Sequence, residues 1–166
     1  RLWPNQQVRQ AGLGAESSNQ NWRSYCLNTC AEFTKLRVYG DEKWSELLPM
    51  EVEIKKEVDY YGPLADIYAS AAYNLNLTSM LLPHGLTQRH FDVWSTGGFL
   101  LTDFTKGLEI FPQELFKPIS FSHPEQLSQI MENLEKEPGL RNELGLAWPN
   151  LIRNEHTYVQ RAEYIL

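Results

Sequence analysis

The sequence predicts an α/β fold in which helices flank a mostly parallel sheet. Through the middle of the chain, short runs rich in β-branched and aromatic residues alternate with segments whose apolar residues recur at helical spacing. Right-handed crossovers onto a parallel sheet are the natural way to connect such alternating elements. Residues 122–166 carry helical patterns only, so we expect a helical C-terminus.

Size and composition fit one folded domain. The chain has 166 residues, of which 42% are hydrophobic and 12% aromatic, as in a globular protein with its own core. Its 15 basic and 21 acidic residues give a net charge of −6, which argues against a nucleic-acid partner but leaves room for a local anion site. No apolar run approaches the ~20 residues of a membrane span, and the first residues lack the layout of a signal peptide.

We therefore expect residues 1–166 to form a single cytoplasmic domain without a membrane span. The chain begins at Arg1 and not at a methionine, which suggests a fragment of a longer polypeptide. Cys26 and Cys30 lie one turn apart on a predicted helix, and we interpret them as small core residues in a reduced compartment. The four histidines are scattered along the chain, so no metal site is expected.

The N-terminal residues are the least informative part of the sequence. Residues 1 to about 20 predict a loop because they contain two glycines and a polar run. The Gly-Leu-Gly at 12–14 lacks the third glycine of a dinucleotide fingerprint, which argues against an NAD-type dehydrogenase. Residues 21–33 repeat their apolar side chains at helical spacing and predict one helix. Residues 1–35 have no further assignment.

Five strands and two intervening helices are predicted between residues 36 and 122. The strands are expected at 36–40, 52–59, 72–78, 99–103 and 117–122. One helix is expected at 62–71, where Pro63 stands at a helix-starting position, and another at 87–96.

The C-terminal part carries two helix-starting signals. Ser122 with Glu125, and Thr157 with Gln160, have the spacing of capping boxes. Pro138–Gly139 is expected to break the helical run between them. The last helix has an apolar stripe, made of Tyr158, Ala162, Ile165 and Leu166.

Open parallel sheets bind ligands at the carboxyl ends of their strands. The loops at this predicted edge follow four residues, namely Gly40, Asp59, Thr78 and Asp103.

The segment HGLTQRHFDVWSTGGFLLTD (84–103) has the pattern of a nucleotide site. Gly85 lets the backbone approach a ligand closely. The amides of Thr87, Gln88 and Arg89 begin the following helix, where the positive end of the helix dipole favours phosphate, and the Arg89 guanidinium could grip a phosphate oxygen. Asp92 could accept hydrogen bonds from a sugar diol.

Plain structural alternatives remain open for the same residues. Arg89 and Asp92 could form a surface ion pair worth under ~1 kcal/mol. His84 could be an ordinary loop histidine. Gly97–Gly98 could serve as a helix stop that also makes the tight turn into the next strand.

The same segment resembles the second-domain signature of GT-B glycosyltransferases, in which two glutamates separated by seven residues precede a helix, a glycine and a strand. His84 and Asp92 fall on the two glutamates, and Gly85 and Gly97 on the family's glycines. The chain is most similar to the CgeB-like branch, named for a spore maturation protein. The shared patterns are LRVYGDEKW (36–44), YGPLADIYASAAYNLNLT (61–78), RHFDVWSTGGFLLTD (89–103) and HTYVQRAEYIL (156–166).

The resemblance implies a Rossmann-like C-terminal half of a GT-B fold, which holds a nucleoside-diphosphate sugar as donor substrate and needs no cofactor. An N-terminal GT-B domain of the same chain would supply the acceptor side. Asp92 would bind the ribose, His84 the donor sugar, and the amides from Thr87 to Arg89, which include that of Gln88, the diphosphate. Tyr60 and Tyr61 would receive the base. His84 and Arg89 are the candidates for catalytic roles.

Two positions depart from the family pattern. Asp92 is one methylene shorter than the usual glutamate, and His84 replaces a carboxylate with a group that is mostly neutral at pH 7. No general base stands out, so the isolated fragment is expected to bind a donor without turning it over. The alternative functions are a non-catalytic nucleotide-binding module and a protein-interaction module of the same fold.

Overall fold

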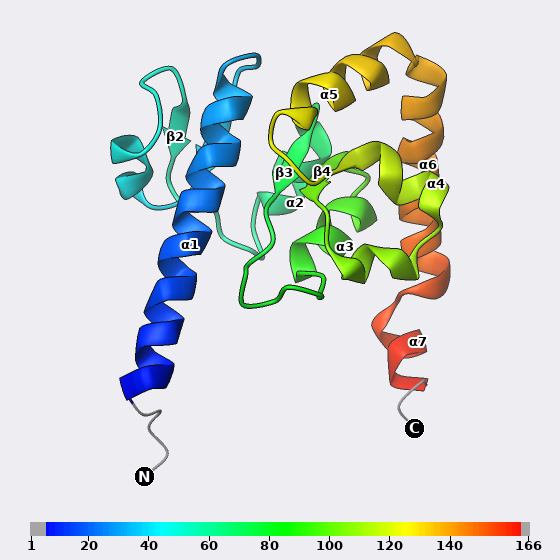
Figure 1. The fold of residues 1–166 in the computed structure, drawn as a ribbon. Helices are drawn as coiled ribbons and strands as arrows, with labels where there is room; N and C mark the ends of the chain where they lie inside the picture. The colour runs from blue at the N-terminus through cyan, green and yellow to red at the C-terminus, as the bar shows by residue number, and fades with distance from the viewer. Residues whose placement is uncertain (1–5, 164–166) are drawn as a thin grey trace.

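Five short strands form two parallel sheets in the computed structural model, which describes residues 6–163 (Figure 1). In the first sheet β1 (Arg37–Tyr39) pairs with β2 (Glu53–Lys55). In the second, β4 (Leu100–Asp103) lies between β3 (Asn74–Asn76) and β5 (Ser120–Phe121). All neighbouring strands are parallel, which confirms the predicted α/β class.

Helices connect and flank the strands. They are α1 (Gln6–Ala31), α2 (Leu64–Ser70), α3 (Gln88–Ser95), α4 (Gln113–Phe116), α5 (Gln126–Lys136), α6 (Pro138–Glu155) and α7 (Tyr158–Glu163). Three short 3-10 helices are η1 (Glu42–Glu46), η2 (Lys106–Ile110) and η3 (Lys117–Ile119). Helix α3 packs on β3, β4 and α6, and α5 packs on α6 (Figure 1). The helical C-terminus is confirmed.

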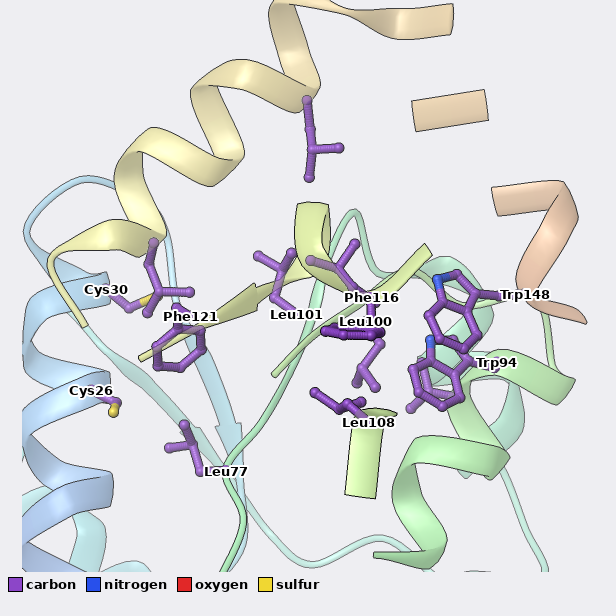
Figure 2. Close-up of a cluster of buried hydrophobic side chains, with 14 of the residues drawn as sticks. Cys26, Cys30, Leu77, Trp94, Leu100, Leu101, Leu108, Phe116, Phe121 and Trp148 are labelled. Atoms are coloured by element: carbon purple, nitrogen blue, oxygen red, sulfur yellow. The ribbon is translucent and has the colours of Figure 1, made fainter. Parts of the chain in front are cut away.

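The core gathers around β4, which is buried along its whole length. Leu100 and Leu101 are 1% and 2% exposed, as expected for a strand covered on both faces. Trp94 of α3 stacks on Trp148 of α6 with ring centroids 3.8 Å apart, so these two helices are fixed to each other (Figure 2). On the other side of the sheet, α1 contributes buried cysteines, which confirms their interpretation as core residues (Figure 2).

The predicted N-terminal loop is wrong for the residues that the structure describes. Helix α1 runs without interruption from Gln6 to Ala31, and so includes both the predicted loop and most of the helix predicted at 21–33. Its first half is rich in good helix formers, and their propensity outweighs the ~1 kcal/mol that each of Gly12 and Gly14 costs in a helix interior. Residues 1–5 lie outside the described part.

The predicted strands and central helices are present with shorter bounds. Helix α2 starts after Pro63, and α3 starts after Thr87, as the sequence indicates. The last predicted strand is mostly wrong, because Lys117–Ile119 forms a 3-10 helix and only Ser120–Phe121 pairs with β4.

One of the two predicted capping boxes forms. Gln160 accepts the amide of Thr157 at 2.8 Å and returns its own amide to the Thr157 hydroxyl at 3.4 Å. The box at Ser122 and Glu125 is wrong: the side chain of Gln126 accepts the Ser122 amide at 2.8 Å, while the Glu125 carboxylate accepts a hydrogen bond from Tyr25 of α1.

The remaining C-terminal predictions are confirmed in part. The break between α5 and α6 lies at Glu137, and Pro138 and Gly139 stand in the first turn of α6, where proline is well tolerated. In the apolar stripe predicted for the last helix, Tyr158 is 81% exposed and Ala162 is also exposed, so this part is not packed. Ile165 and Leu166 lie outside the described residues.

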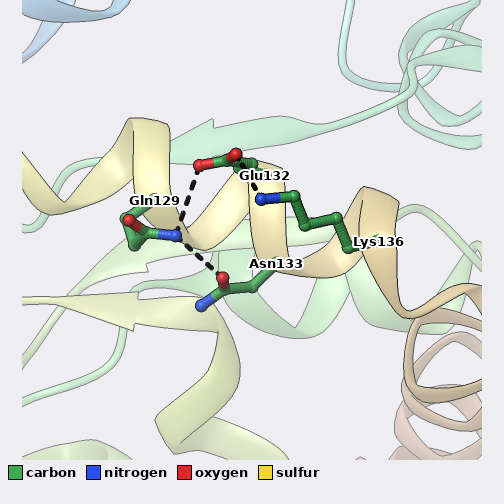
Figure 3. A network of polar contacts seen from close by, with 4 residues as sticks. All are labelled: Gln129, Glu132, Asn133 and Lys136. Atoms are coloured by element: carbon green, nitrogen blue, oxygen red, sulfur yellow. Dashed lines mark hydrogen bonds and ion pairs between the residues drawn. The ribbon is translucent and has the colours of Figure 1, made fainter.

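The surface of α5 shows how exposed polar residues are arranged on these helices. Gln129 donates to Glu132 and Asn133, and Lys136 pairs with Glu132 one turn away (Figure 3). Such exposed pairs contribute only a few tenths of a kcal/mol each.

Candidate functional site

The carboxyl ends of β3 and β4 meet at one edge of the sheet. Thr78, just after β3, donates its amide and its hydroxyl to the carboxylate of Asp103 at 2.8 and 2.9 Å. Trp22 of α1 donates its indole N–H to the same carboxylate at 3.1 Å. Asp103 therefore ties α1 to the sheet edge, where two of the four predicted edge positions lie side by side.

The N-terminus of α3 lies against this edge and is held by a buried histidine. His90 is fully buried, and its Nδ1 lies 3.1 Å from the amide nitrogen of Thr87, which can only donate. Its Nε2 therefore carries the proton and donates to the hydroxyl of Thr102, 3.0 Å away. The Nδ2 of Asn76 lies 3.2 Å from the same ring nitrogen, but both groups are donors, so Asn76 donates instead to the Thr102 hydroxyl at 3.4 Å. Burial lowers the pKa of His90 to about 4, so the ring is neutral at pH 7.

This capping arrangement changes which amides α3 offers to an anion. The Thr87 amide already has the His90 ring as its acceptor. The next amides, those of Gln88 and Arg89, belong to the first turn, which intrahelical bonding leaves without partners. A phosphate at this end of the helix would therefore meet Gln88 and Arg89 rather than Thr87.

Three of the residues that the sequence singled out converge on one point. Gln88 and Asp92 lie one turn apart on the same face of α3, and both reach the hydroxyl of Tyr60, which comes from the loop between β2 and α2. The side-chain amide of Gln88 donates to that hydroxyl at 2.6 Å. The hydroxyl lies 3.2 Å from each oxygen of the Asp92 carboxylate. Partial burial raises the pKa of Asp92, while the Tyr60 hydroxyl and the charge of Arg89 act to lower it.

Arg89 and Tyr61 lie beside this cluster with their side chains exposed. Among residues 6–163, no ion pair joins Arg89 to Asp92, so the surface ion pair considered as an alternative role for Arg89 is not observed. The Tyr61 ring is 92% exposed and meets the Tyr60 ring edge to face, with centroids 5.1 Å apart. Its amide donates to Asp59 at 3.1 Å, which fixes the turn that carries both tyrosines.

His84 and Gly85 belong to a loop that is fixed to the segment after β4. The Gly85 carbonyl accepts a hydrogen bond from the Thr105 hydroxyl at 3.3 Å. A Cβ atom at Gly107 would lie 3.1 Å from the His84 carbonyl oxygen and 3.0 Å from the Gly85 carbonyl carbon, so the two loops touch backbone to backbone. The His84 side chain is exposed.

The double glycine after α3 makes the turn into β4. Gly97 has φ of 79°, a left-handed conformation that glycine adopts without strain. Gly98 is required for a different reason, since a Cβ there would lie 2.6 Å from the carbonyl oxygen of Tyr68. The two glycines therefore stop the helix and let α2 approach β4 closely.

Two structural features of this edge are not predicted from the sequence. His90 stands three residues after Thr87, the spacing of a capping box with histidine in place of glutamate, and that signal could have found it. The contact between Trp22 and Asp103 joins residues 81 positions apart and carries no local signal.

A cavity of about 1120 Å³ opens between the two sheets. Residues of β1, α2 and β3 line it, and Arg89 reaches it from the start of α3. The contacts of the Tyr60 hydroxyl with Gln88 and Asp92 lie outside this cavity, on the exposed face of α3. The candidate site is therefore an open surface with the cavity behind Arg89.

Residues 6–163 contain neither a candidate metal site nor a candidate membrane span. No group of three or more His, Cys, Asp and Glu side chains is placed to hold a metal ion. No helix in that range combines the length and apolar character that crossing a membrane requires.

Comparison with known proteins gives one family. A family model described as glycosyl transferase-like matches residues 23–166, which include every described strand and all of helix α3. No match was found among curated proteins or among solved structures. The parallel α/β architecture and the helical C-terminus are those of a Rossmann-like domain, and the chain belongs to the glycosyl transferase-like family.

Proposed function

We propose that this domain binds the nucleoside-diphosphate sugar donor of a GT-B glycosyltransferase of the CgeB-like branch. The observation that carries the proposal is the convergence of Tyr60, Gln88 and Asp92 at the start of α3, in a chain whose family transfers sugars. A half-buried carboxylate one turn from the first amides of the helix offers an acceptor for a diol beside donors for a phosphate, which is the chemistry of a nucleotide.

Each residue has a proposed role. Asp92 accepts the ribose hydroxyls, while the amides of Gln88 and Arg89 and the Arg89 guanidinium bind the diphosphate. His84 contacts the donor sugar. The exposed ring of Tyr61 packs against the base, and Tyr60 lies between base and ribose.

Catalysis in this scheme comes from positioning the donor and stabilising the departing diphosphate. Arg89 is the candidate for the second role, because its side chain is exposed at the end of the helix where the diphosphate would lie. The His84 imidazole can form a hydrogen bond to the sugar. We propose that the acceptor, and any general base it needs, are held by a second domain of the complete enzyme.

A non-catalytic nucleotide-binding domain is the second candidate. Histidine at position 84 favours it, because a single imidazole cannot hold two sugar hydroxyls as a carboxylate does. Sugar transfer by the complete protein separates the two candidates, since only the enzyme would consume its donor. A protein-interaction module would bind no nucleotide at all.

A thermal-shift panel tests donor binding. UDP, GDP, ADP, TDP and CDP are each added to the domain and to two variants, Asp92→Ala and Asp66→Ala. A ligand at 100 times its Kd stabilises by ~2.7 kcal/mol, which raises the Tm of a domain of this size by several degrees. We expect a shift with one base, kept in Asp66→Ala, whose exposed carboxylate lies on α2, and lost in Asp92→Ala. A flat response to all five would contradict the proposal.

A further inference from the structure

The hydroxyl of Tyr60 occupies the position on Asp92 that a ribose would need. It lies 3.2 Å from Oδ1 and 3.2 Å from Oδ2, so it is centred on the carboxylate rather than bound to one side. A vicinal diol binds a carboxylate with one hydroxyl on each oxygen. The phenol and the diol therefore cannot both engage Asp92 in full.

The direction of the hydrogen bonds follows from the groups present. An ionised Asp92 only accepts, so the single Tyr60 proton points to it. The phenol oxygen in turn accepts a hydrogen bond from the side-chain amide of Gln88 at 2.6 Å. Gln88 thus holds Tyr60 in place from the side opposite Asp92.

The contact to Asp92 is weak enough to be exchanged. A hydroxyl bound well to a carboxylate lies at about 2.5–2.7 Å, and 3.2 Å is much longer. Tyr60 is 46% exposed, so water competes for both groups. The surrounding segment belongs to no helix or strand, and its turn is closed by a bond from the Gly62 amide to the Asp59 carbonyl, which does not involve the tyrosine side chain. Rotation of the Tyr60 side chain alone would uncover Asp92.

We propose that Tyr60 is a latch that covers the Asp92 carboxylate in the nucleotide-free domain and moves aside when a ribose binds. The inference rests on the proposed function, and it adds a regulated step to that site. The latch makes binding dependent on the ribose: a ligand with a diol recovers the hydrogen bonds that Tyr60 gives up, whereas a bare diphosphate does not need Asp92. Non-productive occupation of the carboxylate by other polar groups is reduced in the same way.

The experiment compares Tyr60→Phe with the wild-type domain in titrations with the nucleoside diphosphate that gives the largest thermal shift, and with inorganic pyrophosphate. Phenylalanine keeps the ring and removes only the hydroxyl. Loss of the exposed hydrogen bonds that the hydroxyl makes with Asp92 and Gln88 in the free state is expected to tighten nucleoside diphosphate binding about three- to tenfold and to leave the pyrophosphate Kd unchanged. Tyr25→Phe is the matched control, because it removes another tyrosine–carboxylate bond, between Tyr25 of α1 and Glu125, away from α3.

The outcomes separate the latch from the function on which it rests. If the wild type binds the nucleoside diphosphate and Tyr60→Phe binds it equally well or more weakly, the latch is overturned. The proposed donor site is not affected by that result. An equal gain for pyrophosphate would also overturn it, since that gain would show a general opening of the surface. Absence of nucleotide binding by both proteins would refute the proposed function, and the latch with it.

Discussion

Acid should destabilise this domain through one buried histidine. His90 has no exposed surface, and burial lowers its pKa from 6.5 to about 4 despite the opposing effects of the Thr87 carbonyl and the Asp103 charge. At about 1.4 kcal/mol for each pH unit, that difference corresponds to about 3 kcal/mol of unfolding free energy. Because the pKa of His90 is lower in the folded state, acid favours the unfolded state. Above pH 6.5 the ring is neutral in both states, and the domain keeps this stabilisation in full.

As the pH falls from 6.5 to about 4, the unfolded chain takes up a proton that the folded domain refuses, so stability is lost across this window. Below it both states are protonated, and the loss stays constant. The variant His90→Gln removes this titration because glutamine has no titratable group. Glutamine can still accept the Thr87 amide with its oxygen and donate to Thr102 with its nitrogen.

Urea unfolding at a series of pH values, followed by tryptophan fluorescence, measures this effect. The difference in unfolding free energy between the wild type and His90→Gln should change by about 3 kcal/mol between pH 7 and pH 4. His84→Gln is the control, since that side chain is exposed, and its curve should run parallel to the wild type. A wild-type curve that runs parallel to His90→Gln over the whole range would refute the argument.

Other substitutions test the core, the turn and the proposed anion site. Leu100→Ala, in the buried central strand, should cost ~2–5 kcal/mol in urea unfolding, and a cost under 1 kcal/mol would contradict its burial. Gly98→Ala should destabilise more than Gly97→Ala, because the first forces a clash with the Tyr68 carbonyl at 2.6 Å while the second strains only φ, by about 1–2 kcal/mol; the reverse order of Tm values would be inconsistent with this turn. Arg89→Ala should weaken a nucleoside diphosphate about tenfold in calorimetric titrations and the matching nucleoside hardly at all, and a uniform loss would assign the arginine a structural role.

The sequence predicted those features that local chemistry determines. The turn after α3 follows from two adjacent glycines, and the start of α3 from a threonine followed by helix-forming residues. Gln88 and Asp92 share a helix face because they are four residues apart. The buried strand at 99–103 follows from its apolar run and the glycines before it.

Features that depend on long-range contacts were not predictable in this way. Tyr60 meets Asp92 across 32 residues, and the indole of Trp22 meets Asp103 across 81. The first half of helix α1 differs from the predicted loop because helix formers surround Gly12 and Gly14, so the glycines do not break the helix. The arrangement of the strands in two sheets separated by a cavity likewise depends on packing that no local pattern encodes.

The Asp92 carboxylate is proposed to bind the ribose of a nucleotide donor. Isothermal titration calorimetry tests this role, with the nucleoside diphosphate that gives the largest thermal shift titrated into the wild type and into Asp92→Asn. Asparagine keeps the size of the side chain but removes the charge and one acceptor, so we predict one binding site per chain and a Kd at least about tenfold weaker in the variant, with the far-UV circular dichroism spectrum unchanged. An equal Kd for the two proteins would contradict the claim.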